Sequence, residues 1–172
     1  MESAMDGSRR ADRPRTKRVA VAAEPLLGDA AYDYADAFEV RLDQPDTHTA
    51  EQWVRTALEE SPAVVVGLVR FVHARIAGFQ PSSAPGNVLG WQVASTSADT
   101  FHIRTSGRLL RAEIVARRTS PTVAGFSTYL FYEKPITRVV WAFIGPLHRL
   151  IAPYLLRRAA SSLTKPTVAA QR

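Results

Sequence analysis

The sequence predicts a single α+β domain in which a curved antiparallel sheet and two short helices precede one long C-terminal helix. Three observations support this fold class. Five runs of residues are strand-like, two short helical patterns follow the first of them, and a long apolar helical segment closes the chain. At 172 residues, with 46% hydrophobic and 22% charged residues, the chain is large and apolar enough to bury one core.

The first elements along the chain are a strand and two short helices. Residues 34–42 alternate with a period of two, and the apolar members of one face are Tyr34, Phe38, Val40 and Leu42. A capping box then opens a helix at Thr49. A serine followed by proline opens the second helix at Ser61, and Gly78 is its expected end.

The next part of the chain contains four further strand-like runs. They cover residues 89–97, 100–106, 109–118 and 123–133. The breaks between them are short and rich in Ser, Gly and Pro, as is typical of hairpin loops. We therefore expect an antiparallel meander. Both faces of the last run carry aromatic residues, so alternation does not decide which face lines the interior.

The final helix is predicted over residues 139–163. Pro146 and Pro153 lie on the same side, and an interior proline costs about 3 kcal/mol, so the segment is either one curved helix or two shorter ones. His148 and Arg149 near its centre would be costly in lipid, which favours an amphipathic helix over a membrane span. Helical spacing predicts one inward apolar stripe, with Trp141 and Ala152 beside it: Val140, Phe143, Ile144, Leu147, Ile151 and Leu155.

Charge and composition define the ends of the domain. The formal net charge is +6, and half of it lies in residues 1–18. We expect residues 1–29 to be a disordered basic tail, 30–163 the folded domain and 164–172 a flexible tail. The N-terminus lacks the apolar run of a secretory signal, and the chain has no cysteine, so a cytoplasmic location is expected.

The titratable residues give few catalytic signals. The chain has neither a nucleophile motif nor a phosphate-binding loop, and its four histidines lack metal-ligand spacing, so no metal or cofactor is expected. His148 is the best candidate for a hydrogen-bond donor or general base, with a simple packing role as the alternative. The carboxylates near the first strand, Asp36 and Glu39 among them, are interpreted as a solvated strand face. Glu113 is expected in exposed cross-strand ion pairs.

The aromatic residues favour a pocket over a nucleic-acid platform, because they alternate with aliphatic residues and not with Lys or Arg. We expect a cavity between the sheet and the last helix, with His148 as the polar group that orients a ligand. The predicted lining is Trp91, Phe101, Ile103, Ile114, Phe126, Trp141, Leu147 and His148.

The order of elements resembles the helix-grip fold of the START-like (SRPBCC) superfamily, which includes lipid-transfer domains, plant hormone receptors and aromatic polyketide cyclases. The chain is most similar to a family of small bacterial START-like domains with no assigned function. The likeness covers about residues 30–160 and implies a ligand cavity, but it assigns no catalytic residue. The fold usually has six or more strands, and the sequence shows five. The matching features are Asp33-Tyr34-Ala35-Asp36, Trp53, the helix around Arg70–Arg75, Gly90-Trp91 and Pro146–Ile151.

Three functions follow as hypotheses. The first and favoured one is non-enzymatic binding or carriage of a small hydrophobic molecule, such as a lipid or polyketide-like ring. The second is an enzyme of the polyketide cyclase, dehydratase or hydrolase type that uses the same cavity, with His148 as acid–base. The third is an interaction module whose basic N-terminal tail contacts nucleic acid or, peripherally, an anionic membrane. Of these partners, nucleic acid is disfavoured.

Overall fold

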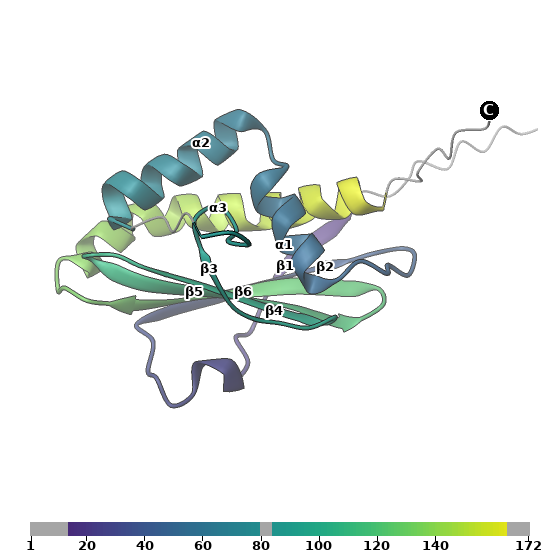
Figure 1. The fold of residues 1–172 in the computed structure, drawn as a ribbon, viewed down its shortest axis with the longest axis horizontal. Helices are drawn as coiled ribbons and strands as arrows, with labels where there is room; N and C mark the ends of the chain where they lie inside the picture. Colours follow the sequence, from purple (N-terminus) through teal and green to yellow (C-terminus); the bar gives the residue numbers. More distant parts are fainter. Residues whose placement is uncertain (1–13, 80–83, 165–172) are drawn as a thin grey trace, which may run out of the picture.

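The computed structural model describes residues 14–79 and 84–164 of the chain, and it confirms the predicted α+β class. A curved six-stranded antiparallel sheet carries the helices α1, α2 and α3 on one face, an architecture consistent with a helix grip (Figure 1). The order across the sheet is β1-β2-β6-β5-β4-β3. The strands are β1 (Arg15–Val19), β2 (Tyr34–Arg41), β3 (Gln92–Thr96), β4 (Thr100–Ser106), β5 (Leu110–Ser120) and β6 (Val123–Tyr132).

The two short helices lie where the sequence predicts, but the predicted serine cap of the second was wrong: its N-cap is Pro62, and the Ser61 hydroxyl donates to the Ala57 carbonyl of the first helix. The side chain of Thr49 accepts a hydrogen bond from the Gln52 backbone N–H, and the Gln52 side chain accepts one from the Thr49 N–H, which completes the capping box of α1 (Ala50–Glu59). The second helix, α2 (Ala63–Phe71), continues into one π-helical turn, η2 (Val72–Ala77). Gly78 ends this turn in the left-handed conformation, with φ of 68°.

The predicted meander is confirmed, and its longest hairpin joins β5 to β6 at the centre of the sheet. Gly125 of β6 lies so close to β2 that a Cβ atom at this position would be 2.5 Å from the Phe38 carbonyl oxygen. The inner face of β6 is the one that carries Phe126 and Leu130, whereas Tyr129 and Phe131 pack on the outer face.

The prediction that residues 1–29 form a disordered tail was wrong for the part that the structure describes. Residues 15–19 form β1, which pairs antiparallel with β2 and is the strand missing from the sequence prediction. Beyond β1 the chain crosses the outer face of the sheet. There Val21 of the connection and Leu27 of the short 3-10 helix η1 (Pro25–Leu27) pack on Val115 and its neighbours. Edge strands often carry charged residues, which prevent pairing with a further strand. The sequence of β1 is of this kind, so it could not be distinguished from a charged tail. Residues 1–13 and 165–172 of the predicted tails lie outside the described part of the chain.

The final helix, α3 (Thr137–Leu163), is one continuous helix that contains both Pro146 and Pro153. The alternative of two separate helices was therefore wrong. The predicted inward stripe was only partly right: Ile144, Leu147, Ile151 and Leu155 face the sheet side, where they line a pocket, whereas Phe143 is 80% exposed. The most buried side of the helix lies beside this stripe and is made mainly of small residues and leucines: Gly145, Ala152, Leu155, Leu156, Ala159 and Ala160.

Candidate ligand-binding pocket

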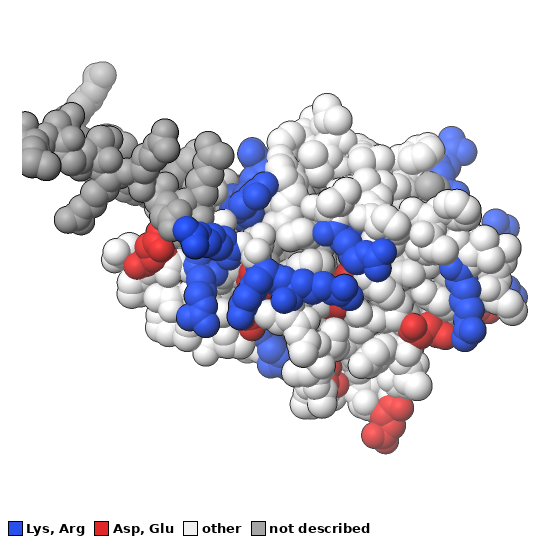
Figure 2. All heavy atoms as spheres, turned by 180° about the vertical axis from the view of Figure 1, so that it is seen from behind, with Lys and Arg blue, Asp and Glu red and all other residues white. Residues whose placement is uncertain are grey.

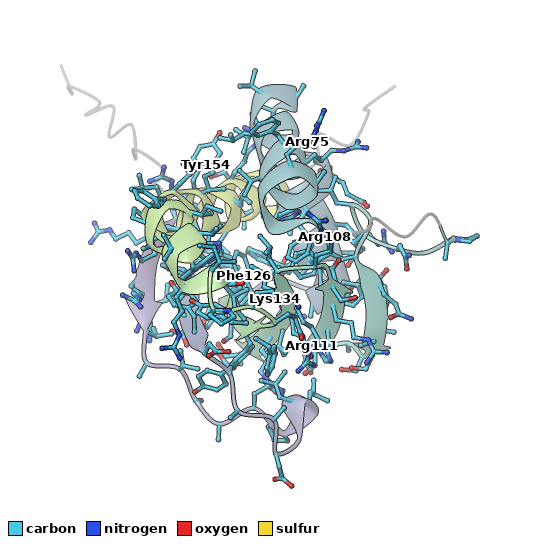
Figure 3. The ribbon with its side chains drawn as sticks, turned by 90° about the vertical axis from the view of Figure 1, so that its left-hand side faces the viewer. Arg75, Arg108, Arg111, Phe126, Lys134 and Tyr154 are labelled. Carbon is cyan, nitrogen blue, oxygen red and sulfur yellow. The ribbon has the colours of Figure 1, made fainter. Side chains whose placement is uncertain are left out.

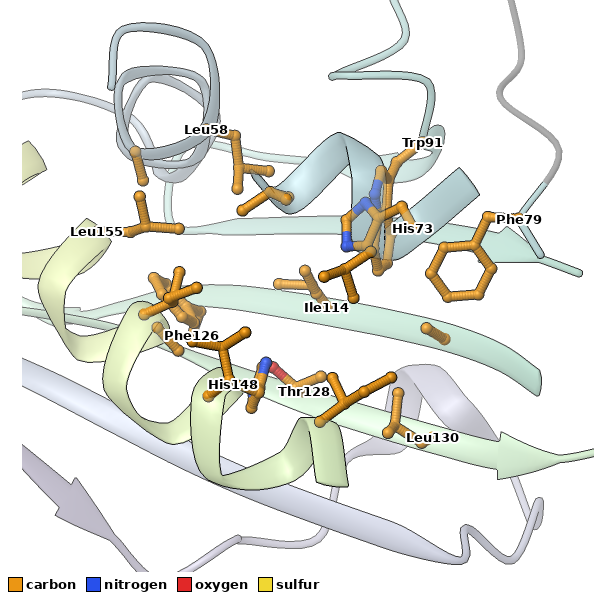
Figure 4. A pocket seen from close by; sticks show the side chains of 18 of the residues that line it. Leu58, His73, Phe79, Trp91, Ile114, Phe126, Thr128, Leu130, His148 and Leu155 are labelled. Carbon is orange, nitrogen blue, oxygen red and sulfur yellow. The ribbon is translucent and has the colours of Figure 1, made fainter. Parts of the chain in front are cut away.

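A pocket lies between the inner face of the sheet and the helical layer (Figure 4). Its volume is about 120 Å³, and apolar cavities of about this size hold small aromatic molecules in other proteins. Strands β5 and β6 form its floor, with Ile114, Phe126 and Leu130 pointing upward. The helices α1, α2, η2 and α3 form its walls and roof, and Trp91 and Phe79 contribute from the connections around β3.

Most of the residues predicted from the sequence line this pocket. Six of the eight do so: Trp91, Ile114, Phe126, Trp141, Leu147 and His148. The prediction was wrong for Phe101 and Ile103, which are fully buried in the core beside the pocket. Both lie on the correct, inner face of β4, where Ile103 is paired with Ile114. Helix α1, which contributes Val54 and Ala50 to the same core cluster, packs near them and leaves no space.

The pocket has a polar end at His148, whose imidazole contacts a carboxylate behind the lining, that of Asp36; the sequence interpretation placed Asp36 on a solvated face. Its carboxylate is fully buried, so that interpretation was wrong. One carboxylate oxygen accepts a hydrogen bond from the Tyr34 hydroxyl at 2.6 Å, and the other lies 3.2 Å from Nε2 of His148. Alternation did contain the signal, because Asp36 shares the parity of Tyr34 and Phe38 and must face α3 with them.

The aromatic rings of this end form one contact cluster. The ring of Trp141 meets that of Tyr34 edge-on at 4.9 Å between centroids and lies 5.4 Å from the imidazole of His148. The indole rests on Gly145, where a Cβ atom would stand 3.2 Å from the indole nitrogen. A glycine one turn after Trp141 therefore allows the ring to lie flat along α3.

Burial changes the titration of Tyr34, which lies behind the pocket lining, and of His73, which is part of the lining. Burial, and next the hydrogen bond to Asp36, raise the pKa of Tyr34 well above its ordinary value, so the phenol stays protonated as a donor. On the opposite wall, burial and then the charge of His148 lower the pKa of His73 to about 4. His73 is held there by ring contacts with Phe79 and Trp91. At neutral pH His73 is therefore uncharged.

Two residues of the pocket lining each carry a fully buried polar atom without a partner. Among the described residues, the buried side-chain atoms without a hydrogen-bond partner are Oγ1 of Thr128 and Nε1 of Trp141. Thr128 lies on β6 directly opposite Asp36 of β2, so its hydroxyl belongs to the same polar end. A buried polar group without a partner costs about 1–3 kcal/mol. The sequence analysis named Trp141 only as an apolar wall and did not name Thr128, because a single threonine among the aromatic residues of this strand gives no signal of its own.

A second buried polar cluster, on β4 and β5, lies outside the pocket. Glu113 contacts His102 at 2.7 Å and pairs with Arg111, whose guanidinium lies over the ring of Phe131. Burial alone would raise the pKa of Glu113. The hydrogen bond from His102 and the positive charges of His102, Arg111 and Arg104 outweigh burial and lower this pKa. The predicted cross-strand pair thus exists, but Glu113 is buried and not exposed as expected. These contacts give Glu113, His102 and Arg111 each a partner within the cluster.

Metal binding finds no support in the residues that the structure describes. No group of three or more His, Asp or Glu side chains there could hold an ion. The sequence matches no family model, and none of the curated proteins compared with it matches either. The function must therefore be argued from the apolar pocket and its polar end.

Proposed function

We propose that this protein binds a small, largely apolar molecule that carries one neutral oxygen, in the pocket between the sheet and α3. The observation that carries the proposal is the pair of unpartnered polar atoms, Thr128 Oγ1 and Trp141 Nε1, in residues that line an otherwise apolar pocket. Buried polar groups in proteins nearly always have partners. A ligand oxygen would supply one here.

The chemistry of the lining narrows the ligand class. An indole N–H only donates, and a threonine hydroxyl both donates and accepts, so the matching group is a carbonyl, hydroxyl or ether oxygen. Among the residues that the structure describes, the lining contains no Lys or Arg, and His73 is neutral at pH 7. The carboxylate of Asp36 is already bound to Tyr34 and His148. A carboxylate ligand would be buried without a strong cation, which is costly.

Kinship with the START-like superfamily is part of the same proposal. The helix that lies across an antiparallel sheet, with the pocket beneath it, supports this kinship. A pocket of this volume suits a single small ring, or one end of a lipid, isoprenoid or polyketide ligand whose remainder extends outside it. Native mass spectrometry of protein purified from its own host would identify a retained ligand.

The proposed polar contact can be tested with two probes that differ by one hydroxyl, p-cresol and toluene. NMR titration of the wild type should show tighter binding of p-cresol. Thr128→Val should reduce this preference about tenfold, equivalent to one good hydrogen bond, and should not destabilise the free protein. Thr105→Val is the matched control, because Thr105 is a buried threonine on β4 outside the pocket lining. Equal affinity of the wild type for both probes, or binding of neither, would contradict the proposal.

A cavity enzyme is the second candidate, and the contact between Asp36 and His148 favours it. A buried carboxylate beside one imidazole nitrogen fixes the orientation of the ring, as in proteins that use histidine as a general base. The ligand found by mass spectrometry would be incubated with wild type and His148→Gln. Loss of conversion with retained binding would support catalysis, and equal conversion would eliminate the role of His148.

A further inference from the structure

The outer surface of the helical layer is apolar to an unusual degree. Helix α2 buries none of its residues, although it is rich in valine and leucine. Helix α3 presents a second apolar stripe on the side opposite His148 and Ala152, with members spaced by four and seven positions. We define the outer apolar face by its six residues, which are between 39% and 83% exposed: Val64, Leu68, Phe71, Val139, Phe143 and Leu150.

Both helices lie on the same side of the sheet, as two views of the molecule show. In Figure 1 the helices α2 and α3 form the layer above the sheet. Figure 3 looks along this layer, where Phe126 lies between helices and sheet while Arg75 and Tyr154 lie on the outer side. The outer apolar face therefore belongs to one layer of the molecule. Large apolar side chains exposed together on one layer of this kind mark a candidate binding surface.

The charges on α2, η2 and α3 have one sign, in contrast to those on α1, which carries Glu51 and Glu59. The segments 63–77 and 137–163 contain no Asp or Glu. Figure 2 shows the same tendency on the back of the molecule, where basic side chains form a band beneath a largely uncharged upper region. The arginines of the two segments are all exposed: Arg70, Arg75, Arg138, Arg149, Arg157 and Arg158.

We infer that the outer apolar face of α2 and α3 docks onto an anionic lipid bilayer. Apolar side chains enter the boundary between headgroups and acyl chains, while the flanking arginines reach the lipid phosphates. This surface differs from the basic N-terminal tail to which the sequence assigned membrane contact. Docking requires no ligand in the pocket, so the inference stands apart from the proposed binding function.

The same residues argue against a membrane span. By length and composition α3 is long and apolar enough to cross a bilayer, a property that the core helices of water-soluble proteins share. Its inner side, however, packs on the domain through Ala152 and Leu155, and His148 at its centre is bound to Asp36. Placing Arg149 at the middle of a bilayer would add a further cost. The helix therefore suits a position on the membrane surface.

A second copy of the chain fits this face poorly. In a symmetric dimer the outer faces would meet each other, which would bring together the exposed arginines of two identical helix pairs without any carboxylate on those helices. An anionic lipid surface supplies the missing negative charge. It also accommodates a wide, convex apolar surface without requiring shape complementarity.

The test is flotation of the full chain with vesicles of phosphatidylcholine alone or mixed with phosphatidylglycerol. The wild type should float with the mixed vesicles, bind the neutral ones much more weakly, and be released by salt. Phe143→Glu should lower the partition coefficient about tenfold or more. Leu26→Glu is the matched control, because Leu26 is also an exposed large apolar residue but lies on the opposite side of the sheet. It should bind like the wild type.

Folding and competing explanations are controlled separately. Phe143 is 80% exposed, so Phe143→Glu should keep the wild-type circular dichroism and unfolding midpoint, and Leu150→Ser provides a second variant. Thr128→Val, which alters only the pocket, should float like the wild type and so separates docking from ligand binding. Absence of flotation in the wild type, or equal loss in Phe143→Glu and Leu26→Glu, would overturn the inference. A dimer in solution that Phe143→Glu dissociates, without vesicle binding, would overturn it in favour of self-association.

Discussion

The depressed pKa of His73 makes a quantitative prediction for stability against pH. Burial, and next the charge of His148, lower the pKa of His73 from 6.5 to about 4. The unfolded chain therefore binds a proton that the folded protein does not bind between these values. The contribution of His73 to the free energy of unfolding is therefore fully present above pH 6.5 and is lost as the pH falls toward 4. Between pH 8 and pH 5 the linkage amounts to about 2 kcal/mol, a large part of the stability of a small domain.

Urea unfolding of the wild type and His73→Phe between pH 5 and pH 8 measures this term. A phenylalanine keeps the ring packing against Phe79 and Trp91 but removes the titration. Carboxylates also contribute to the pH dependence. Burial would raise the pKa of Asp46, but hydrogen bonds from His48 and Trp53 outweigh burial and hold it down, so Asp46 loses its stabilising contribution as the pH falls. This loss is the same in the wild type and in His73→Phe. The difference between the two proteins therefore isolates His73. It should change by about 2 kcal/mol over the range; parallel curves would refute the assignment of a neutral, desolvated His73.

Three further substitutions test other parts of the structure. Asp36→Ala should destabilise by about 2–4 kcal/mol, because it leaves the buried hydroxyl of Tyr34 without its acceptor, and Asp36→Asn should cost less in the same urea assay. Glu24→Gln should cost about 1 kcal/mol and raise hydrogen exchange in residues 20–33, because Glu24 holds Arg117 through two hydrogen bonds; unchanged exchange would exclude that anchor. Gly107→Ala should cost about 1–3 kcal/mol, because its Cβ would stand 2.4 Å from a backbone oxygen at the end of η2; a neutral effect in thermal unfolding would contradict this.

Elements with a local signal were predictable from the sequence. The capping box of α1, the glycine at the end of η2 and the hairpins of the meander each depend on residues a few positions apart. The floor of the pocket followed from alternation along β5, which correctly placed Ile114 inward. By contrast, β1 is held by backbone pairing with β2, and its side chains carry no alternation that distinguishes it from a charged tail.

The orientation of α3 was not predictable, because the helix is apolar on nearly every side. Periodicity alone selected the side with the largest apolar residues, including Phe143. The sheet instead packs against the side with the small residues, Gly145, Ala152 and Ala159, which let the helix approach closely. The burial of Asp36 was missed for a related reason. A carboxylate is assumed to face water unless its partner is known, and its partner His148 lies 112 positions further along the chain.

A helix that is apolar on two sides needs two apolar surroundings, and both α2 and α3 are of this kind. The inner sides of these helices are accounted for by the pocket, to which α2 contributes Val69 and α3 contributes Leu147. Their outer sides, where Phe143 is exposed, would contact the proposed lipid surface. If both proposals hold, the wall that separates the pocket from the bilayer is only one helix thick. A hydrophobic ligand then exchanges between membrane and pocket past α2, which packs on the domain only through partly buried residues such as Val65 and Val69 and is the least costly part of the wall to displace.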